Sequence, residues 1–295
     1  MQATQTVMNV NALKKKQKIS KVVRLVITYL FLFLIAFIII FPFYWMIISS
    51  LKDMDEYYLV NPTFFPNEIH WENYPDSMMA AEFGRYMINT VLVGIVSTLL
   101  SLVITVLAAF AFAKLKFKGR DVIFTILLAT MMIPGEMFTV SNYETISFFN
   151  WQDTYIVQIV PFLVSVFYIY LLRQNFKQVP DELYLAAKVD GTSDLKYLMK
   201  VLVPLSMPSI VSITILKMMG SWNAYVWPRL VTTTDDFKLI TNGLREAFTS
   251  TEAGGRVNYP LQMAAVTIVS IPLILVFIFF RKYIMKGVSR AGIKG

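Results

Sequence analysis

The chain contains no cysteine and a single histidine, and this scarcity excludes several kinds of chemistry. Without cysteine there is neither a disulfide nor a thiolate ligand for a metal ion. The histidine, His70, has no acid–nucleophile set near it that would indicate catalysis, and we interpret it as a surface residue. The sequence has no phosphate-binding loop G-x-x-x-x-G-K-[ST], no G-x-S-x-G and no H-E-x-x-H. We therefore predict a chain that is not an enzyme and has no cofactor or metal site of its own.

Charged residues are also scarce, at 16% of 295 residues, whereas 56% of the residues are hydrophobic. That balance is too apolar for a soluble domain and indicates a polytopic membrane protein. The predicted spans are 25–48, 89–113, 122–142, 154–172, 204–220 and 261–280. We expect an all-α integral membrane protein with six transmembrane helices in a domain of residues 25–280, preceded by the segment 1–24 and followed by the tail 281–295.

The basic residues are distributed unevenly. Twenty of the 27 lysines and arginines lie in the segment 1–24, the loop 114–120, the central loop and the tail, and six lie in the long loops 49–88 and 221–260. Acidic residues show the opposite bias. Five of them, including Asp121, lie on the side of the four basic segments, and fourteen, including Glu136, lie on the side of the two long loops. The positive-inside rule then places both termini in the cytoplasm and the two long loops outside. This distribution explains the net charge of +8 without a nucleic-acid partner.

The central loop, residues 176–203, is charged but lies between two apolar spans. Pro180 suits the first turn of a helix, where its missing N–H costs nothing. Gly191 can adopt the left-handed conformation that ends such a helix, and Thr192 or Ser193 can cap a second one. The pattern predicts two short helices just outside the membrane, which either lie on the lipid surface or bind a partner.

Each of these two helices has a predicted apolar face. The residues that share a face by helical spacing are Leu183, Ala186 and Ala187 in the first helix, and Leu195, Leu198, Met199 and Leu202 in the second. The adjacent alanines would let another surface approach the backbone closely.

The same loop resembles the cytoplasmic coupling loop of ABC importer permeases. The matching pattern begins with two adjacent alanines, followed after three residues by a glycine. Nine residues later come an aliphatic residue, any residue, a second aliphatic residue and a proline. In this chain the residues are Ala186-Ala187, Gly191, Val201, Val203 and Pro204. Pro180-x-Glu182-Leu183 and Asp190-Gly191 resemble the carbohydrate branch, the maltose-permease type. Where that family usually has a glutamate before the two alanines, this chain has Leu185.

The resemblance implies the transmembrane fold of type I ABC importers, with half of the translocation pathway for a carbohydrate such as an oligosaccharide. It implies a second related permease subunit, two ATPase subunits that bind ATP and Mg, an external substrate-binding protein, and a bacterial inner membrane as the location. Residues implied to couple to the ATPase are Glu182, Leu183, Leu185, Ala186, Ala187, Asp190, Gly191 and Pro204. The tail, with Lys286-Gly287 and the closing residues 292–295, resembles family tails that contact the ATPase dimer.

Polar residues within or beside the spans are candidates for the translocation path, namely Glu136, Ser209, Ser212 and Asn223. Glu136 follows a Pro-Gly break, so it either lines the path or caps a broken helix at the outer interface. The serines suit hydrogen-bonded helix packing equally well. We interpret Lys217, near the end of the fifth span, as reaching the lipid headgroups.

The second long loop begins with Trp222-Asn223-Ala224-Tyr225-Val226-Trp227-Pro228, which resembles an element of the same carbohydrate branch. Its aromatic rings suit either stacking on a sugar or a belt at the membrane interface. In the family the loop that follows reaches the substrate-binding protein. The candidate contacts with that protein are Trp222, Tyr225, Arg229 and Arg245.

Three alternatives remain open at this point. The same architecture can import a glycerol-phosphate-type polyol phosphate; a cluster of cavity-facing Arg or Lys would favour that cargo, and the spans contain only Lys217. An ion-coupled secondary carrier would transport without ATP or a partner chain. A structural or receptor protein of the membrane would not transport at all.

Overall fold

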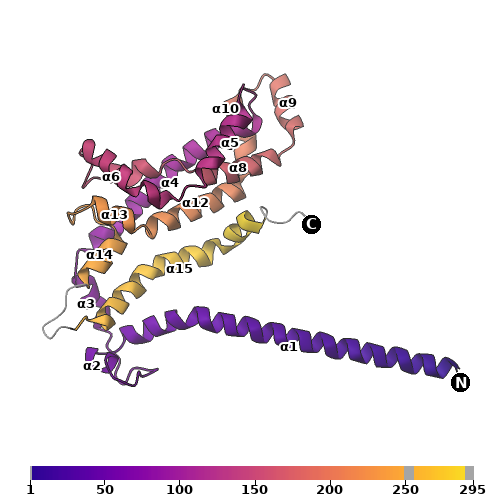
Figure 1. Cartoon of the computed structure of the whole chain (residues 1–295), viewed down its shortest axis with the longest axis vertical. Helices are drawn as coiled ribbons and strands as arrows, with labels where there is room; N and C mark the ends of the chain where they lie inside the picture. Colours follow the sequence, from indigo (N-terminus) through magenta and orange to yellow (C-terminus); the bar gives the residue numbers. More distant parts are fainter. Residues whose placement is uncertain (1, 249–255, 290–295) are drawn as a thin grey trace. The chain divides into compact units, whose positions relative to one another are not determined.

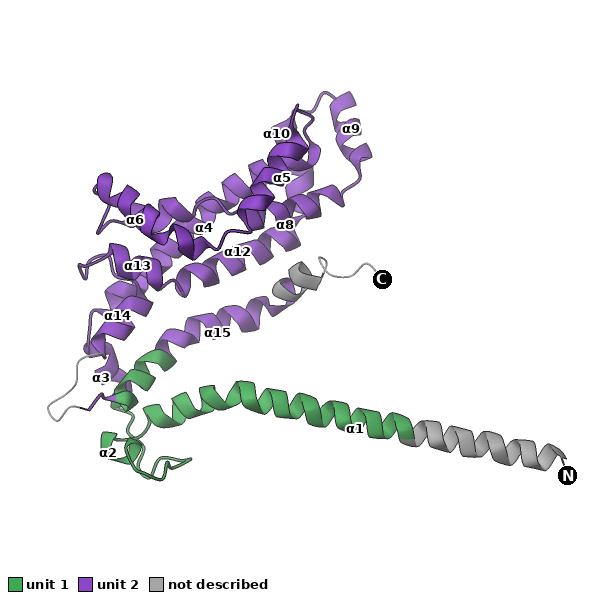
Figure 2. Ribbon diagram, in the orientation of Figure 1, with its two compact units in different colours: residues 1–73, 259–267 green, residues 74–258, 268–295 purple. Residues whose placement is uncertain are grey.

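The computed structural model is helical (Figure 1). It describes residues 2–248 and 256–289, with side chains described for 20–248 and 256–283, and these residues contain no strand. The chain divides into two compact units, residues 1–73 with 259–267 and residues 74–258 with 268–295 (Figure 2).

The first unit holds α1 (Gln2–Ser50), α2 (Met54–Tyr57) and the first turns of α15 (Tyr259–Ser289). The helices up to the central loop are α3 (Asn73–Met79), α4 (Phe83–Lys114), α5 (Arg120–Thr130), η1 (Gly135–Phe138), α6 (Thr139–Phe148), α7 (Tyr155–Ile159), η2 (Val160–Phe162) and α8 (Val166–Lys177). The helices that follow are α9 (Asp181–Val189), α10 (Asp194–Tyr197), η3 (Leu198–Leu202), α11 (Val203–Leu205), α12 (Met207–Trp222), α13 (Val226–Val231) and α14 (Ile240–Ala247).

Six segments are long and apolar enough to cross a membrane when each bent helix pair is taken as one span, which confirms the predicted fold class. Three are single helices, at residues 20–50, 83–114 and 259–283. Three are helix pairs, bent by 85° between α5 and α6, by 46° between η2 and α8, and by 81° between α11 and α12. Proline lies at or beside each bend, because it removes a helical hydrogen bond and crowds the preceding turn.

Helix α4 is central to the second unit and packs against both α8 and α12 (Figure 1). Ser97, Ser101 and Thr105 are buried on it at intervals of four residues, which is one helix face. Small side chains on that face let neighbouring helices approach closely, as membrane helices require. Nearer Lys114, the apolar residues of the core are Ala109, Phe110, Ala113, Leu172, Phe176, Tyr197, Leu198, Leu202 and Ile213.

In the first unit, the segment after α1 folds back onto the end of that helix. Lys52, 1% exposed, donates from Nζ to the carbonyl oxygen of Thr63 at 2.5 Å. Asn73 donates to the carbonyl oxygens of Ser50 and Lys52 at 3.0 and 2.8 Å. His70 lies 2.6 Å from the exposed Glu72 carboxylate, a contact that raises the pKa of His70.

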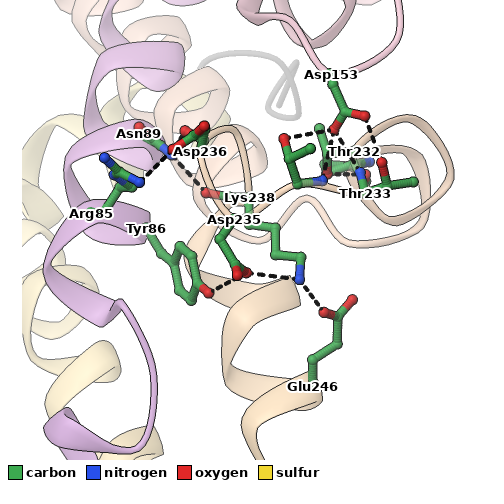
Figure 3. Close-up of polar contacts among 12 residues, drawn as sticks. Arg85, Tyr86, Asn89, Asp153, Thr232, Thr233, Asp235, Asp236, Lys238 and Glu246 are labelled. Atoms are coloured by element: carbon green, nitrogen blue, oxygen red, sulfur yellow. Dashed lines mark hydrogen bonds and ion pairs between the residues drawn. The ribbon is translucent and has the colours of Figure 1, made fainter.

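The first turns of α4 also hold the segment that follows α13 (Figure 3). Asn89 donates from Nδ2 to the carbonyl oxygens of Asp236 and Lys238, at 2.9 and 3.0 Å. The hydroxyl of Thr90 accepts from the backbone N–H of Ile240 at 2.9 Å. Because an irregular segment cannot pair these backbone groups within itself, the side chains of α4 fix its path.

A chain of polar contacts continues from Tyr86 to α14 (Figure 3). The Tyr86 hydroxyl donates to Asp235 at 2.7 Å, and Lys238 Nζ lies 2.9 Å from Asp235 and 2.6 Å from Glu246. Hydrogen bonds from Lys238 and Tyr86 hold the pKa of Asp235 below its ordinary value. The stability from these bonds is therefore present above the ordinary pKa of 3.8 and is lost as the pH falls through the lowered one.

Asp153, between α6 and α7, fixes the other side of the same segment (Figure 3). Its carboxylate accepts from the backbone N–H groups of Thr233 and Thr234 at 2.7 and 2.9 Å, and from the Thr233 hydroxyl at 2.6 Å. The N–H of Asp153 donates to the Val231 carbonyl at 2.9 Å. The segment is thus attached to two parts of the second unit that are far apart in sequence.

The contact between α14 and α4 generates a prediction. A Cβ atom added at Gly243 would lie 2.1 Å from Cδ2 of Tyr86, whose ring is buried and whose hydroxyl is already bonded. We expect Gly243→Ala to destabilise the protein by about 1–3 kcal/mol, because the ring must move in a packed site. Thermal unfolding of the purified membrane protein measures the effect as a lowered midpoint. The matched control is Gly84→Ala, where an added Cβ has no neighbour within 4 Å; equal midpoints for the two variants would contradict the close contact.

Candidate functional site

The central loop forms two short helices, and the first of them, α9, ends in a Schellman motif. Gly191 has a φ of +69°, and its N–H donates to the Lys188 carbonyl at 3.1 Å. The N–H of Thr192 donates to the Ala187 carbonyl at 2.8 Å. These two bonds satisfy carbonyls at the helix end, and the left-handed conformation predicted for the glycine is confirmed.

The second helix of the loop is α10, which continues into the π-helical turn η3. Ser193, one of the two predicted caps, accepts a backbone N–H at 3.4 Å. Leu198 and Leu202 are fully buried, whereas Leu195 and Met199 are 60% and 57% exposed. Leu195, Leu198 and Met199 nevertheless line one apolar groove beside α4, so these side chains lie together as the predicted stripe requires, and packing covers only part of the stripe.

An aromatic cluster joins the two helices to the core. The ring centroid of Tyr184 lies 5.0 Å from that of Tyr197 and 6.3 Å from that of Phe110. The Tyr184 hydroxyl donates to Asp194 Oδ1 at 2.6 Å, and Lys188 Nζ lies 2.7 Å from the same oxygen. The bond to Asp194 raises the pKa of Lys188. Helices α9 and α10 are thereby held together as one body against α4.

A buried ammonium group fastens the start of α9. The Lys114 side chain, at the end of α4, is only 1% exposed, and its Nζ donates to the Val179 carbonyl at 2.7 Å and to Asp181 Oδ1 at 2.5 Å. Its hydrogen bond lowers the pKa of Asp181. The loop is thus fixed to α4, the helix against which α8 and α12 pack.

A second buried cation fixes the end of α8. The Arg173 guanidinium donates from Nε to the Phe112 carbonyl at 3.0 Å and lies 3.4 Å from Asp121. Its Cζ lies 3.9 Å from the centroid of the Phe124 ring. Helix α8 is therefore joined to α4 and α5, and the start of α9 to α4, by cations with several partners each.

The other side of α9 is exposed and apolar. Leu183, Leu185 and Val189 are 44%, 56% and 88% exposed, and Ala186 is exposed beside them. Ala187 is half-buried against the core, so the three residues predicted to share one face do not have equal exposure. A cluster of exposed apolar side chains outside the spans indicates a surface that contacts another molecule.

The other predicted coupling residues have different positions. Glu182 and Asp190 are exposed at the two ends of α9 and its cap. Pro204 is exposed too, but it lies on α11. The structure thus gathers most of this set on α9 and its cap, beyond the end of α8 (Figure 1). The roles of these residues remain predictions.

The candidate path residues lie on different elements. Glu136 is exposed on η1, directly after the break, and Asn223 is exposed at the end of α12. Ser209 and Ser212 are buried, and the Ser212 hydroxyl lies 2.8 Å from the Pro208 carbonyl and 2.6 Å from the Tyr283 carbonyl. Ser212 thus forms a hydrogen bond between α12 and α15, which agrees with a role in helix packing.

The aromatic run after α12 is largely packed within the chain. Trp222 and Trp227 are 6% and 9% exposed, and Trp227 Nε1 donates to the Val157 carbonyl at 3.0 Å. Tyr225 accepts from Arg229 at 2.6 Å, and the guanidinium carbons of Arg229 and Arg245 lie 5.7 and 5.3 Å from its ring centroid. Of the loop predicted to reach a binding protein, residues 249–255 lie outside the described residues.

The predicted basic ends of the chain are also only partly described. The side chains of residues 1–19 and 284–289 and the tail residues 290–295 lie outside the described part. The contact of the tail with an ATPase therefore remains a prediction.

Sequence reasoning missed a cavity of about 430 Å³ between α4, α7, α8, α12 and α13, which we call the Lys217 cavity. Its polar lining includes Ser97, Gln158, Ser165, Tyr168, Lys217 and Tyr225. Lys217 donates from Nζ to the Phe162 carbonyl at 2.6 Å, at the break between η2 and α8. The sequence held no signal for this contact, because Phe162 lies 55 residues from Lys217 in the chain.

Comparison with known proteins agrees with this architecture. Residues 101–290 match the family model described as binding-protein-dependent transport system inner membrane component. The arabinooligosaccharides transport system permease protein AraQ of Halalkalibacterium halodurans is 30% identical over 285 residues, which cover 95% of this chain and 100% of that protein. The diacetylchitobiose uptake system permease protein NgcG of Streptomyces coelicolor is 27% identical, with 90% and 87% covered.

A solved structure shows the same fold. It belongs to a bacterial ABC transporter involved in the import of the acidic polysaccharide alginate, and it matches with a TM-score of 0.79 at 22% identity. The match covers 88% of this chain and 95% of that one. Together with the family model, these likenesses show that the chain belongs to the family of binding-protein-dependent transport system inner membrane components, which are non-catalytic permease subunits of ABC importers.

Proposed function

We propose that this chain is one of two permease subunits of an ATP-driven importer of oligosaccharides. Two of its relatives bear the names of arabinooligosaccharide and diacetylchitobiose transport, and both align over most of their length. The observation that carries the coupling part of the proposal is α9, a short helix with an exposed apolar side and a side fixed to the core. A partner ATPase supplies the surface that covers the exposed side.

The coupling contact consists of the exposed residues of α9 with its cap. Leu183, Leu185 and Ala186 form the apolar part, and Glu182 and Asp190 provide charge at its two ends. Gly191 sets the direction of the chain after the helix. Leu185 replaces the charged contact usual in the family with an apolar one, so burial of surface contributes more to docking here than an ion pair does.

Displacement of α9 then reaches the spans through the buried cations. Lys114 transmits it to α4, and Arg173 connects α8 with α4 and α5. Closure of two ATPase subunits around ATP and Mg would draw the α9 helices of the two permeases together. ATP binding shifts the equilibrium toward the outward-open state only if the closed ATPase dimer binds that state more tightly than the inward-open one.

The topology follows from charge. By the positive-inside rule, α9 and both termini are on the cytoplasmic side of the membrane, and the segment after α13 is on the outer side. There, Tyr225, Arg229, Arg245 and the following loop contact the external binding protein. Trp222 is buried and supports that surface from within. Glu136 and Asn223, which are exposed, are better placed for the path than the buried Ser209 and Ser212.

Co-purification tests the composition of this assembly. A tagged copy of the chain, extracted from its native membrane, is expected to bring down a second permease and an ABC ATPase, and to bind a secreted carbohydrate-binding protein when ATP is trapped. Transport by vesicles that contain this chain alone, driven by an ion gradient without ATP, would instead identify a secondary carrier.

Coupling through α9 predicts the effect of two substitutions in the loop. Ala186→Glu places a charge on the exposed side of α9, and Gly191→Pro imposes a φ near −65° where the chain has +69° and removes the N–H bonded to Lys188. We expect both variants to insert normally and to lose uptake, measured with radiolabelled oligosaccharide in cells. Ala80→Glu adds the same charge at an exposed position directly after α3, in the second unit but away from α9, and is the control. Normal uptake by both loop variants would argue against coupling through α9.

The apolar nature of the contact predicts the effect of Leu185→Ser. Removing an exposed leucine that becomes buried on docking costs about 1.5–3 kcal/mol, which is roughly a tenfold or greater loss of affinity. On dilution of the detergent-purified complex, the ATPase is therefore expected to dissociate at a protein concentration about tenfold higher, or more, than in the unsubstituted complex. Val60→Ser, at a valine that is 96% exposed in the first long loop, is the control. If Leu185→Ser retains the ATPase as well as the control does, Leu185 is not part of the contact.

A further inference from the structure

We propose that the Lys217 cavity binds an anionic group, a carboxylate or a phosphate, on the transported carbohydrate. This inference rests on the proposed function and narrows its substrate class to acidic or phosphorylated sugars. It depends on four observations, which concern the lysine, two arginines, the polar and aromatic lining, and the size of the cavity.

Lys217 is a cation without an acidic partner. Its ammonium group makes one hydrogen bond, to the Phe162 carbonyl, and an ammonium group has three N–H donors. Among the described residues, none of those that line the cavity is a carboxylate, and Lys217 forms no ion pair. A lysine in a membrane span normally pairs with an acid or extends to the headgroups. Lys217 instead turns toward the break after η2, so two donors remain for a ligand.

Two more cations lie close to one of the residues that line this cavity. Tyr225 lines it, and the guanidinium carbons of Arg229 and Arg245 lie 5.7 and 5.3 Å from the Tyr225 ring centroid. In the described part of the chain neither arginine forms an ion pair with a carboxylate. Of the nearby acids, Asp236 pairs with Arg85, and Asp235 and Glu246 share Lys238. Two arginines without a carboxylate partner among the described residues thus adjoin the ring of a residue that lines the cavity.

The remaining lining suits a sugar. Gln158 lines the cavity and is 5% exposed, and its buried Oε1 finds no hydrogen-bond partner among the described residues, which leaves one acceptor unpaired beside the cavity. Tyr168 also lines the cavity, and its hydroxyl forms no hydrogen bond among the described residues. The rings of Phe162 and Trp227 meet edge to face at 5.7 Å and provide apolar surface for the face of a pyranose. A volume of about 430 Å³ lies within the usual range for small-molecule sites.

The test uses the complete importer with its binding protein, reconstituted in phosphatidylcholine vesicles. Matched pairs of sugars are the probes, cellobiose with cellobiouronic acid and galactobiose with digalacturonic acid, together with glucose 6-phosphate and acidic and neutral polysaccharide hydrolysates. ATPase stimulation and uptake are measured for each. Acidic or phosphorylated sugars are expected to stimulate ATP hydrolysis and to be taken up, whereas their neutral counterparts are expected to stimulate hydrolysis only weakly.

Variants then assign the effect to the cavity. Lys217→Gln is expected to raise the sugar concentration for half-maximal uptake of the acidic cargo by about 10- to 100-fold, as for loss of a hydrogen bond to a charged group, and Lys217→Arg to restore most of it. Lys118→Gln, which removes the same charge from an exposed loop, is the control. An unchanged response of Lys217→Gln to the acidic cargo would overturn the assignment.

The outcomes separate this inference from the proposed function. If only neutral oligosaccharides stimulate ATP hydrolysis, the inference of an anionic cargo is wrong, and the proposed function as an oligosaccharide importer is retained. If no sugar stimulates ATP hydrolysis, both the inference and the proposed function are wrong. An anionic lipid is the other source of such a group. If Lys217→Gln alters the response to neutral and acidic sugars equally, and only when phosphatidylglycerol is present, the cavity holds a lipid phosphate and the inference is wrong.

Discussion

The contact between the buried Lys114 ammonium and the start of α9 is the constraint on which the rest of the structure depends. One donor pairs with the Val179 carbonyl and another with the Asp181 carboxylate, so a helix outside the spans is joined to the helix at the centre of the unit. A charge buried to this extent is tolerated only when it has such partners, and removing one would leave the ammonium group uncompensated. The loop cannot therefore move independently of α4.

This constraint separates the two sides of α9. Tyr184 and Ala187 face the core, and the polar link from Tyr184 to Asp194 keeps α9 and α10 together. Leu183, Leu185 and Val189 are left outside, where they expose apolar surface to whatever docks there. A helix with one fixed and one free side can act as a lever, because a force applied to the free side displaces the helices behind it without local unfolding.

The opposite end of the second unit is organised by different contacts. There, side chains of α4 and Asp153 bind the backbone of an irregular segment, and Gly243 lets α14 approach the Tyr86 ring. The Lys217 cavity lies between these two ends, lined by α4, α8 and α12. A ligand in that cavity would contact α4 and α8, which Arg173 joins to each other, and Lys114 joins α4 to α9; under the proposed mechanism, binding and coupling therefore involve the same helices.

Much of this could be predicted from the sequence, because composition and spacing act locally. The apolar runs predicted six spans, and Gly191 predicted the end of α9, since only a residue that tolerates positive φ suits a Schellman motif. The bend near Pro134 was expected as well, because proline removes a backbone donor.

The sequence by itself determined the number of spans, the charge bias and the helix ends, since each depends on neighbours within a few residues of the chain. Only the tertiary structure decided which side of each helix is covered. Leu195, Leu198, Met199 and Leu202 have equal claims to burial by hydrophobicity, and packing against α4 and α12 buried only two of them. Lys217 was likewise predicted to extend to the lipid headgroups. In the structure its ammonium group instead donates to the carbonyl of Phe162, a residue 55 positions away in the chain.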